Sequence, residues 1–289
     1  MSTDPNTTAR LLARCPDRPG IVAAVTNFFF DHGANITALD QHATDSSGGT
    51  FFLRLEFQTP QLDLSGEALQ RTFGELIAPR FDMDFTMHFA AQPMKAAVLV
   101  SRHDHCLREL LWRWSNGELP VELACVISNH PDLAEEVERF GIAFRHIQVN
   151  GEPRELAGRR LLEALPEDLD VLVLARYMQI LSAEVVEKFP CRIINIHHSF
   201  LPAFVGADPY RQAWDKGVKI IGATAHYVTA ELDQGPIIDQ EIARVSHRHG
   251  VADLRLLGRD LERQTLSRAL QWHAESRIIV DGHKTIVFA

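Results

Sequence analysis

Short apolar runs rich in β-branched residues recur through the second two-thirds of the chain, and they constrain its fold more than any other feature. The segments between them place apolar side chains at helical spacing. Strands that alternate with helices in this way build a mostly parallel sheet with helices on both faces. Strands are expected at residues 96–101, 121–127, 144–149, 171–175 and 193–196, and helices at residues 107–114, 133–140 and 159–165.

Beyond this repeat the chain continues with one more strand, a long helix and a short hairpin. Residues 236–245 are expected to form the strand, and residues 253–275 the helix, which carries a row of leucines on one side. Asp281-Gly282 lies between two apolar runs and is a strong signal for a hairpin turn. We therefore expect one α/β domain from residue 94 to residue 289.

The first ninety residues follow a different pattern, in the order strand, helix, strand, strand, helix, strand. This βαββαβ order is the ferredoxin-like plan. A linker, Ala90-Ala91-Gln92-Pro93, follows it, so the 289 residues divide into expected domains at 8–90 and 94–289. The six elements are expected at residues 10–15, 21–32, 35–44, 50–58, 64–77 and 83–89.

Composition argues against several classes of partner. The net charge of −9 and the pI near 5.8 disfavour a nucleic-acid-binding surface. No apolar run approaches the length of a membrane span, and the polar first residues do not form a signal peptide. We expect a cytoplasmic protein with reduced cysteines, of which Cys125 and Cys191 are expected to be buried.

One segment, His103-Asp104-His105-Cys106, raises the question of a metal site. It lacks a recognised ligand spacing, and a polar loop that opens a helix explains it better. We therefore expect neither a metal nor a cofactor.

The end of the strand near residue 196 carries the polar residues that point to chemistry. Asn195 and His197 lie on one face of the strand, because side chains repeat with period two, and Pro202 ends the extended segment. An acidic turn with Asp233 before Gly235 follows downstream. An amide, an imidazole and a carboxylate can activate water and stabilise an oxyanion. The alternative is that the histidine is an ordinary core or surface residue.

These residues resemble a known family. The stretch from Asn195 to Gly235, together with Leu174–Ser182, is similar to the folate-dependent formyltransferase fold over roughly residues 94–289. The resemblance implies that Asn195, His197 and Asp233 are catalytic. It also implies a folate substrate, 10-formyltetrahydrofolate, whose pterin contacts two loops. These loops contain Met178, Gln179, Ile180 and Leu181, and Val228, Thr229, Ala230, Glu231 and Leu232. His198 is a further expected substrate contact.

Two features of the sequence resemble those of the hydrolytic branch of that family. The loop after the first strand, Ser101 to Leu107, lacks the glycines with which the ribonucleotide transformylases hold a phosphate, and His198 stands where they usually carry proline. The resemblance therefore implies hydrolysis to formate and tetrahydrofolate, which balances the one-carbon pool and supplies formate for purine synthesis. Formyl transfer to an amine and a non-catalytic amino-acid or folate sensor remain alternatives.

The first domain resembles the ACT regulatory module, through its element order and the turn Asp17-Arg18-Pro19-Gly20. Proline fixes such a turn, and we expect Gly20 to allow a close backbone approach at the helix start. The resemblance implies a homo-oligomer with a small amino-acid effector, for which Gly20 and Asn35 are the candidate contacts. A module that only dimerises is the alternative.

Overall fold

The computed structural model describes residues 7–45, 48–149, 151–201 and 209–289. Pro202, expected to end the extended segment after His197, lies outside the described residues. The chain divides into two compact units, one formed by Met1–Pro93 with Glu275–Ile279 and Ile286–Ala289, and the other by Met94–Ala274 with Val280–Thr285. The sequence reasoning instead kept residues 94–289 together, and the two short C-terminal segments are the difference.

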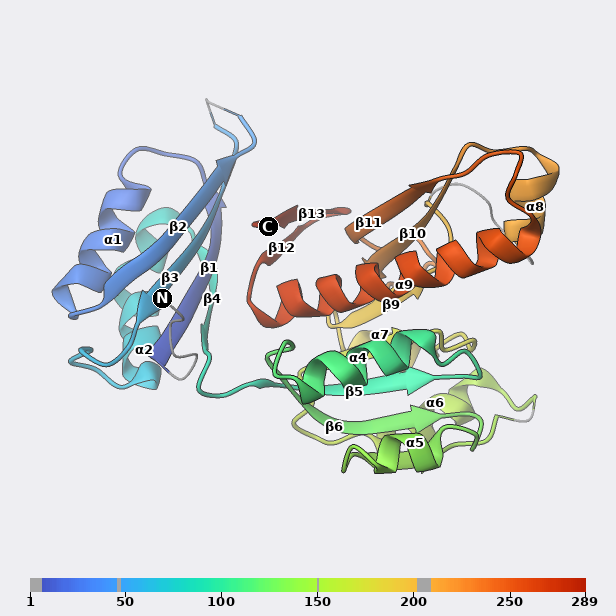
Figure 1. Ribbon diagram of the computed structural model, residues 1–289. Helices are drawn as coiled ribbons and strands as arrows, with labels where there is room; N and C mark the ends of the chain where they lie inside the picture. Colours follow the sequence, from blue (N-terminus) through green and yellow to red (C-terminus); the bar gives the residue numbers. More distant parts are fainter. Residues whose placement is uncertain (1–6, 46–47, 150, 202–208) are drawn as a thin grey trace. The chain divides into compact units, whose positions relative to one another are not determined.

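The sheet of the first unit is antiparallel throughout, with strand order β2-β3-β1-β4. Helices α1 and α2 cover one face of it (Figure 1). This arrangement confirms the predicted ferredoxin-like fold. Its elements are β1 (Thr8–Pro16), α1 (Ile21–Asp31), β2 (Asn35–Ala43), β3 (Thr50–Gln58), α2 (Gly66–Leu76), the short α3 (Ala78–Phe81) and β4 (Asp84–Phe89).

The turn before α1 works differently from the sequence expectation. Gly20 caps the helix with a φ of 94°, a left-handed conformation that favours glycine. An added Cβ would meet no atom within 4 Å, so no close backbone approach occurs there. Conformation, and not space, is therefore the reason for glycine at this position.

The second unit holds a seven-stranded sheet of order β11-β10-β9-β8-β5-β6-β7. Strands β5 to β9 run parallel, whereas β10 is antiparallel to both of its neighbours. The predicted mostly parallel sheet is thus confirmed. Its strands are β5 (Met94–Val100), β6 (Val121–Ser128), β7 (Ala143–His146), β8 (Val171–Ala175), β9 (Ile193–His197), β10 (Ile220–Tyr227) and β11 (Ile237–Arg244).

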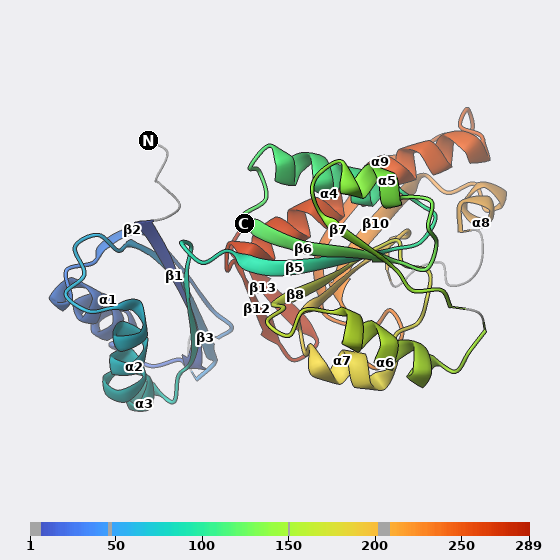
Figure 2. The same ribbon diagram turned by 90° about the horizontal axis from the view of Figure 1, so that it is seen from below.

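Helices cover both faces of this sheet. Helices α4 and α9 lie over one face, and α6 and α7 over the other (Figure 2). From β5 the chain builds outward through β6 and β7 and then returns to β8 on the other side of β5. Ligands of open α/β sheets bind at the carboxyl edge beside such a reversal. The helices are α4 (His105–Ser115), α5 (Ala134–Glu138), α6 (Arg154–Ala164), α7 (Ala183–Lys188), α8 (Pro209–Asp215) and α9 (Val251–Ala274).

Two details depart from the sequence reasoning. Strand β10 was not predicted, because Gly222 and two alanines weaken its β-strand pattern. Cys191 is exposed and has a φ of 54°, since it forms the turn that enters β9, whereas Cys125 is buried as expected. The missed strand matters most, because it carries a residue of the candidate site.

The predicted C-terminal hairpin is present as β12 (Ile278–Asp281) and β13 (Lys284–Val287). Within the first unit, Ile279 and Phe288 pack against Phe52 of β3. Arg54, also on β3 and only 2% exposed, donates a hydrogen bond to the carbonyl oxygen of Ser276 at 3.1 Å. These contacts explain why the last residues group with the N-terminal sheet.

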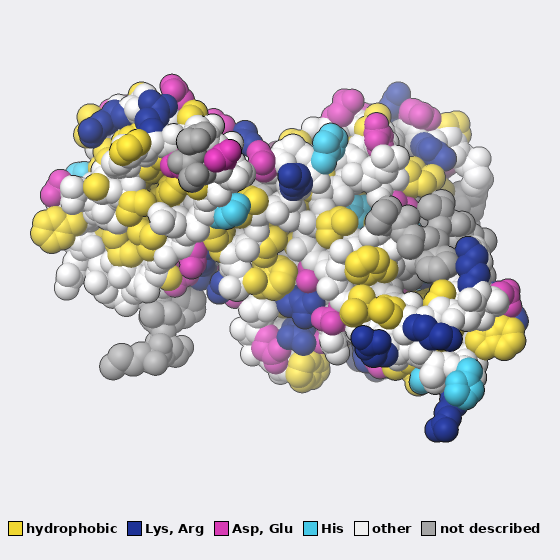
Figure 3. Space-filling model, turned by 90° about the horizontal axis from the view of Figure 1, so that it is seen from above, with side chains coloured by type: hydrophobic (Ala, Val, Ile, Leu, Met, Phe, Trp, Pro, Cys, Tyr) yellow, Lys and Arg dark blue, Asp and Glu magenta, His cyan; other side chains and the backbone are white. Residues whose placement is uncertain are grey.

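The surface is mixed in charge. On the face in Figure 3, acidic and basic side chains are interspersed with apolar ones. The described residues contain no helix with the length and hydropathy needed to cross a bilayer.

Candidate active site

Strand β9 brings Asn195 and His197 to the carboxyl edge of the second unit's sheet. Ile193, Ile194 and Ile196 of this strand are buried, whereas Asn195 and His197 are partly exposed. The buried isoleucines thus hold the strand in the sheet, and the strand presents its two polar side chains on one face. This is the placement that the period of two predicts.

Asp233 reaches these side chains from the loop between β10 and β11. Its Oδ2 lies 3.3 Å from Nδ1 of His197. The residue has a φ of 55°, and the loop is tight, because a Cβ on Gly235 would lie 1.7 Å from the carbonyl oxygen of Tyr227. Gly235 therefore lets the loop fold back against β10 and so positions the carboxylate.

A fourth polar residue, His226, was missed by the sequence reasoning. It lies on β10 directly opposite Asn195 and is 1% exposed. Its Nε2 is 3.1 Å from Nδ2 of Asn195 and 3.7 Å from Oδ1 of Asp233, while its Nδ1 is 2.9 Å from the carbonyl oxygen of Tyr227. A carbonyl only accepts, so Nδ1 carries a proton, and in the neutral ring Nε2 accepts from Asn195.

The two histidines also set the charge of Asp233. The hydrogen bond with His197 and then the proximity of His226 hold the pKa of this carboxyl far below its usual range, although partial burial opposes them. Asp233 is therefore ionised at neutral pH, which makes it a weak proton acceptor and a strong partner for an imidazolium.

His198 packs directly on the site. Its ring stacks on that of His197, with centroids 5.1 Å apart and an interplanar angle of 24°. Burial, followed by the nearby Arg176 and His197, lowers the pKa of His198 to about 4. The ring is thus neutral at pH 7 and adds no positive charge beside His197.

The first predicted folate loop follows β8. Its backbone is fixed where Met178 donates its N–H to Oγ of Ser101 at 2.9 Å, and Ser101 donates in turn to Asn129 at 2.7 Å. A cavity of about 370 Å³ lies beside this loop, and we call it the folate-side pocket. Its wall includes the four predicted residues Met178, Gln179, Ile180 and Leu181.

The second predicted loop lies close to the first one but outside the wall of this pocket. Val228 donates its N–H to the carbonyl oxygen of Ile193 at 2.9 Å, and it packs with Leu181 on the same apolar cluster. Ala230, Glu231 and Leu232 are exposed, and Thr229 is partly exposed. The structure therefore brings Val228 together with the first loop, whereas residues 229–232 face solvent.

Behind the site lies a buried carboxylate that sequence reasoning also missed. Glu262 of α9 is 2% exposed and contacts Nε2 of His105 at 2.8 Å, the hydroxyl of Tyr210 at 2.9 Å and Nε of Arg176 at 3.3 Å. Tyr210 fits there because residue 258 is glycine, since a Cβ at that position would lie 1.9 Å from the tyrosine hydroxyl. We call these four residues the Glu262 cluster.

The Glu262 cluster bears on the metal question. Within the described residues, the ligand atoms of His105, Cys106 and Glu262 lie close enough to hold an ion. Both oxygens of Glu262 already have partners, however, and burial raises the pKa of the Cys106 thiol well above its usual value. A protonated thiol is a poor metal ligand, so this geometry favours the alternative, a polar loop that opens α4. That catalysis needs no metal stays a prediction.

The ACT candidates belong to the first unit. Gly20 and Asn35 are both exposed, at the start of α1 and of β2. The positions of Gly20 and Asn35 do not show whether a ligand binds there, so their role stays a prediction.

Comparison with known proteins agrees with this architecture. The Formyl transferase family matches residues 94–270, and the ACT domain matches residues 9–74. A protein of Mycobacterium tuberculosis named formyltetrahydrofolate deformylase is 52% identical over 279 residues, which cover 96% of this chain and 90% of the relative. A Bacillus subtilis protein of the same name is 51% identical and covers 96% and 93%.

Solved structures extend the comparison. A formyltetrahydrofolate deformylase from Pseudomonas syringae superposes with a TM-score of 0.94 at 45% identity, covering 98% of this chain and 94% of the other. A glycinamide ribonucleotide transformylase from Symbiobacterium toebii gives a TM-score of 0.65 at 34% identity and covers 68% of this chain and 95% of its own. With its ACT domain and its transferase-type domain in one chain, this enzyme belongs to the formyl transferase family and, within it, to the formyltetrahydrofolate deformylases.

Proposed function

We propose that the enzyme hydrolyses 10-formyltetrahydrofolate to formate and tetrahydrofolate. The observation that carries the proposal is the arrangement of His197 with Asp233 and of Asn195 with His226 at one sheet edge. Similarity to the deformylases supports water as the acceptor. Transfer to an amine and a sensor without activity are not favoured by these relatives.

The folate would bind beside the first loop. Met178 and Ile180 are 56% and 46% exposed, and Leu232 across the site is 62% exposed. Large apolar side chains that remain exposed around a pocket are typical of a ligand site. The flat pterin would cover these side chains, and backbone groups of residues 178–181 would supply its hydrogen bonds. The remaining residues of the second loop, 228–231, are proposed as further contacts.

The attack requires a base, and His197 fits that role better than Asp233. Asp233 is a weak base, because two histidines lower its pKa. Asp233 would instead accept a hydrogen bond from Nδ1 of His197, leaving Nε2 to take the proton from water. The imidazolium that forms is stabilised by the ionised carboxylate.

The oxyanion would be stabilised by Asn195. One N–H of its amide is directed to Nε2 of His226, which leaves the second N–H for the formyl oxygen. As the tetrahedral intermediate collapses, the C–N10 bond breaks and His197 returns its proton to N10. The formic acid that forms then loses its proton to solvent and becomes formate. Formate and tetrahydrofolate then leave the site. No step requires a metal, and prolonged dialysis against EDTA should leave turnover unchanged.

An assay of formate release from 10-formyltetrahydrofolate tests the proposal. Run with and without primary-amine acceptors, it should give formate at the same rate in both cases. Formyl transfer to an added amine would favour the transferase alternative, and substrate binding without turnover would favour the sensor.

We also propose the setting of this activity. Four free cysteines fit a reducing compartment such as the cytoplasm, where the reaction would balance the one-carbon pool and provide formate for purine synthesis. The edge position and exposure of β2 support pairing of ACT domains in a homo-oligomer. A small amino acid bound near Gly20 and Asn35 would then regulate it. Sedimentation and thermal shift with glycine, methionine and serine test these two proposals.

A further inference from the structure

A second cavity, distinct from the folate-side pocket, opens on the other side of Met178. It measures about 370 Å³, and both Met178 and His198 contribute to its wall. Met178 also lines the folate-side pocket, so the two cavities share this residue in their walls. His198 stacks on His197, which places this cavity one ring away from the hydrolytic site.

The charge of this cavity is positive. Among the residues that the structure describes, Arg176, Arg255 and Arg259 line it with Glu262 as the one carboxylate, and we call it the arginine pocket. Two of the three histidines in its wall, His103 and His198, add little charge, because burial and then Arg176 lower the pKa of both. Within this described part of the wall, three guanidinium groups against one carboxylate give an excess of about two positive charges.

One arginine of the pocket, Arg176, is held by a buried partner. Arg176 follows β8 with a φ of 62°, and its Nε contacts the buried Glu262 at 3.3 Å. The Nε atom is buried and has no well-aligned hydrogen bond, so the ion pair leaves part of its bonding capacity unused. A guanidinium fixed in this way is preorganised for an anion.

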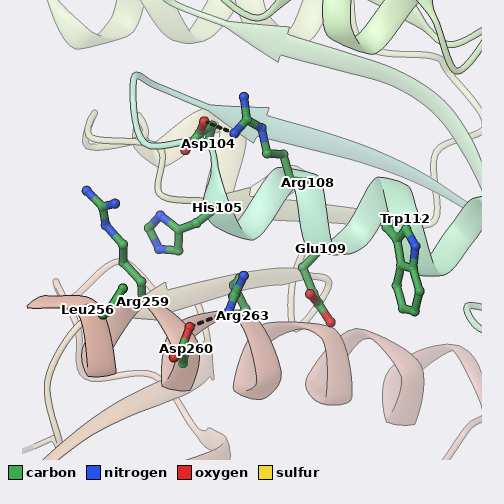
Figure 4. Close-up of a pocket in the computed structure, with 9 residues that line it drawn as sticks. All are labelled: Asp104, His105, Arg108, Glu109, Trp112, Leu256, Arg259, Asp260 and Arg263. Carbon is green, nitrogen blue, oxygen red and sulfur yellow. Dashed lines mark hydrogen bonds and ion pairs between the residues drawn. The ribbon is translucent and has the colours of Figure 1, made fainter.

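Arg259 stands at the opposite side, on α9. Figure 4 shows it extending from the helix beside His105, with no hydrogen bond or ion pair to the other side chains drawn. Both Arg259 and Arg263 line the neighbouring groove between α4 and α9, but Arg263, one turn further along α9, pairs with Asp260 and does not line the arginine pocket. Helix α9 thus offers Arg259, which lines the pocket, and Arg263, a matched arginine that does not.

Resting on the proposed hydrolysis, we infer that the arginine pocket binds the formate product as it leaves the hydrolytic site. Formate forms as an anion beside the ionised Asp233, and like charges repel at that distance. The arginine pocket is the positive cavity that adjoins His198, and guanidinium groups are well suited to a carboxylate. The charge arrangement therefore moves the product away from the catalytic carboxylate.

Direct binding of [13C]formate to the full chain, followed by NMR at constant ionic strength, tests the inference. Formate should bind the wild type, and Arg259→Gln should weaken binding by about tenfold, as expected for the loss of one charge-assisted hydrogen bond. Arg259→Lys should restore most of the affinity, and Arg263→Gln should bind like the wild type. Circular dichroism checks that each variant is folded.

Two outcomes would overturn the inference: no formate binding at high millimolar concentration, or equal binding by the wild type and Arg259→Gln. Inorganic phosphate in a parallel titration separates the sources of anion, and a pocket that takes phosphate but not formate would also contradict the assignment. Because binding is read without turnover, an enzyme that binds formate yet releases none from 10-formyltetrahydrofolate would refute only the proposed hydrolysis.

Discussion

Asp233 and Glu262 are two carboxylates of the same unit, and both have lowered pKa values for different structural reasons. Asp233 sits in a loop, partly exposed, and its partners are two histidines of the candidate site. Glu262 sits within a helix, 2% exposed, where burial raises its pKa but hydrogen bonds and the charge of Arg176 and His105 outweigh that effect.

The difference separates a carboxylate that serves the chemistry from one that holds the fold together. Glu262 joins elements that the sequence keeps far apart, since His105 begins α4, Arg176 follows β8 and Tyr210 lies in α8. Both carboxylate oxygens of Glu262 have hydrogen-bond partners within the protein, so no ligand is needed to satisfy them. The contacts of Asp233 orient an imidazole whose other nitrogen remains available. We therefore expect that loss of Asp233 reduces activity at constant stability, and that loss of Glu262 reduces stability first.

The largest effect should follow from changes at the catalytic pair. Asp233→Asn and His197→Ala should each lower kcat by about a thousandfold or more, with folate affinity nearly intact, because their interactions strengthen in the transition state. Steady-state kinetics and folate titration measure both quantities. Asp215→Asn, an exposed change on α8, is the control. Turnover within a few-fold of wild type in either variant would remove the pair from the mechanism.

Glu262→Ala should test the other side of the comparison. Removing one partner of a buried ion pair leaves Arg176 uncompensated and typically costs about 3–5 kcal/mol of stability. Urea unfolding measures the loss, with the exposed Glu184→Ala as control. An unchanged unfolding free energy together with lost activity would instead show that Glu262 takes part in the chemistry.

His226 offers a sharper test, because it touches both Asn195 and Asp233. His226→Phe should lower kcat by about a hundredfold with little change in KM, since a misplaced oxyanion donor loses transition-state contact. In His226→Gln the amide oxygen can accept from Asn195, so part of the activity should return. Equal loss in both variants would indicate a packing role only.

The sequence predicts the strand residues of this site well and the inter-strand partners poorly. Asn195 and His197 follow from a short apolar strand with polar alternate positions, a local pattern. His226 depends on the pairing of β10 with β9, and β10 itself was missed. A histidine two residues beyond Thr224 in a short apolar run was the available signal.

Glu262 was missed for a related reason. The helix was predicted from its leucines, and Glu262 lies on the same buried face, four residues after Gly258 and four before Leu266. A carboxylate on an apolar helical face signals a buried partner, but the sequence does not identify it. The partners come from α4, from the residue that follows β8 and from α8, and only the fold brings these together.

The smallest effect concerns His198, the residue between the two carboxylates. Its pKa in the folded protein is about 4, below the ordinary value of 6.5. Between these values the unfolded chain binds more protons than the folded one, so stability falls as the pH drops from 6.5 toward 4. At pH 5 this linkage amounts to about 2 kcal/mol.

We expect His198→Gln to lose less stability than wild type between pH 7 and pH 5, in urea unfolding at both pH values. His247→Gln, an exposed change, should keep the wild-type dependence. If His198→Gln also kept the wild-type dependence, the ring would be able to accept a proton inside the folded protein, and the stack on His197 would not require a neutral partner.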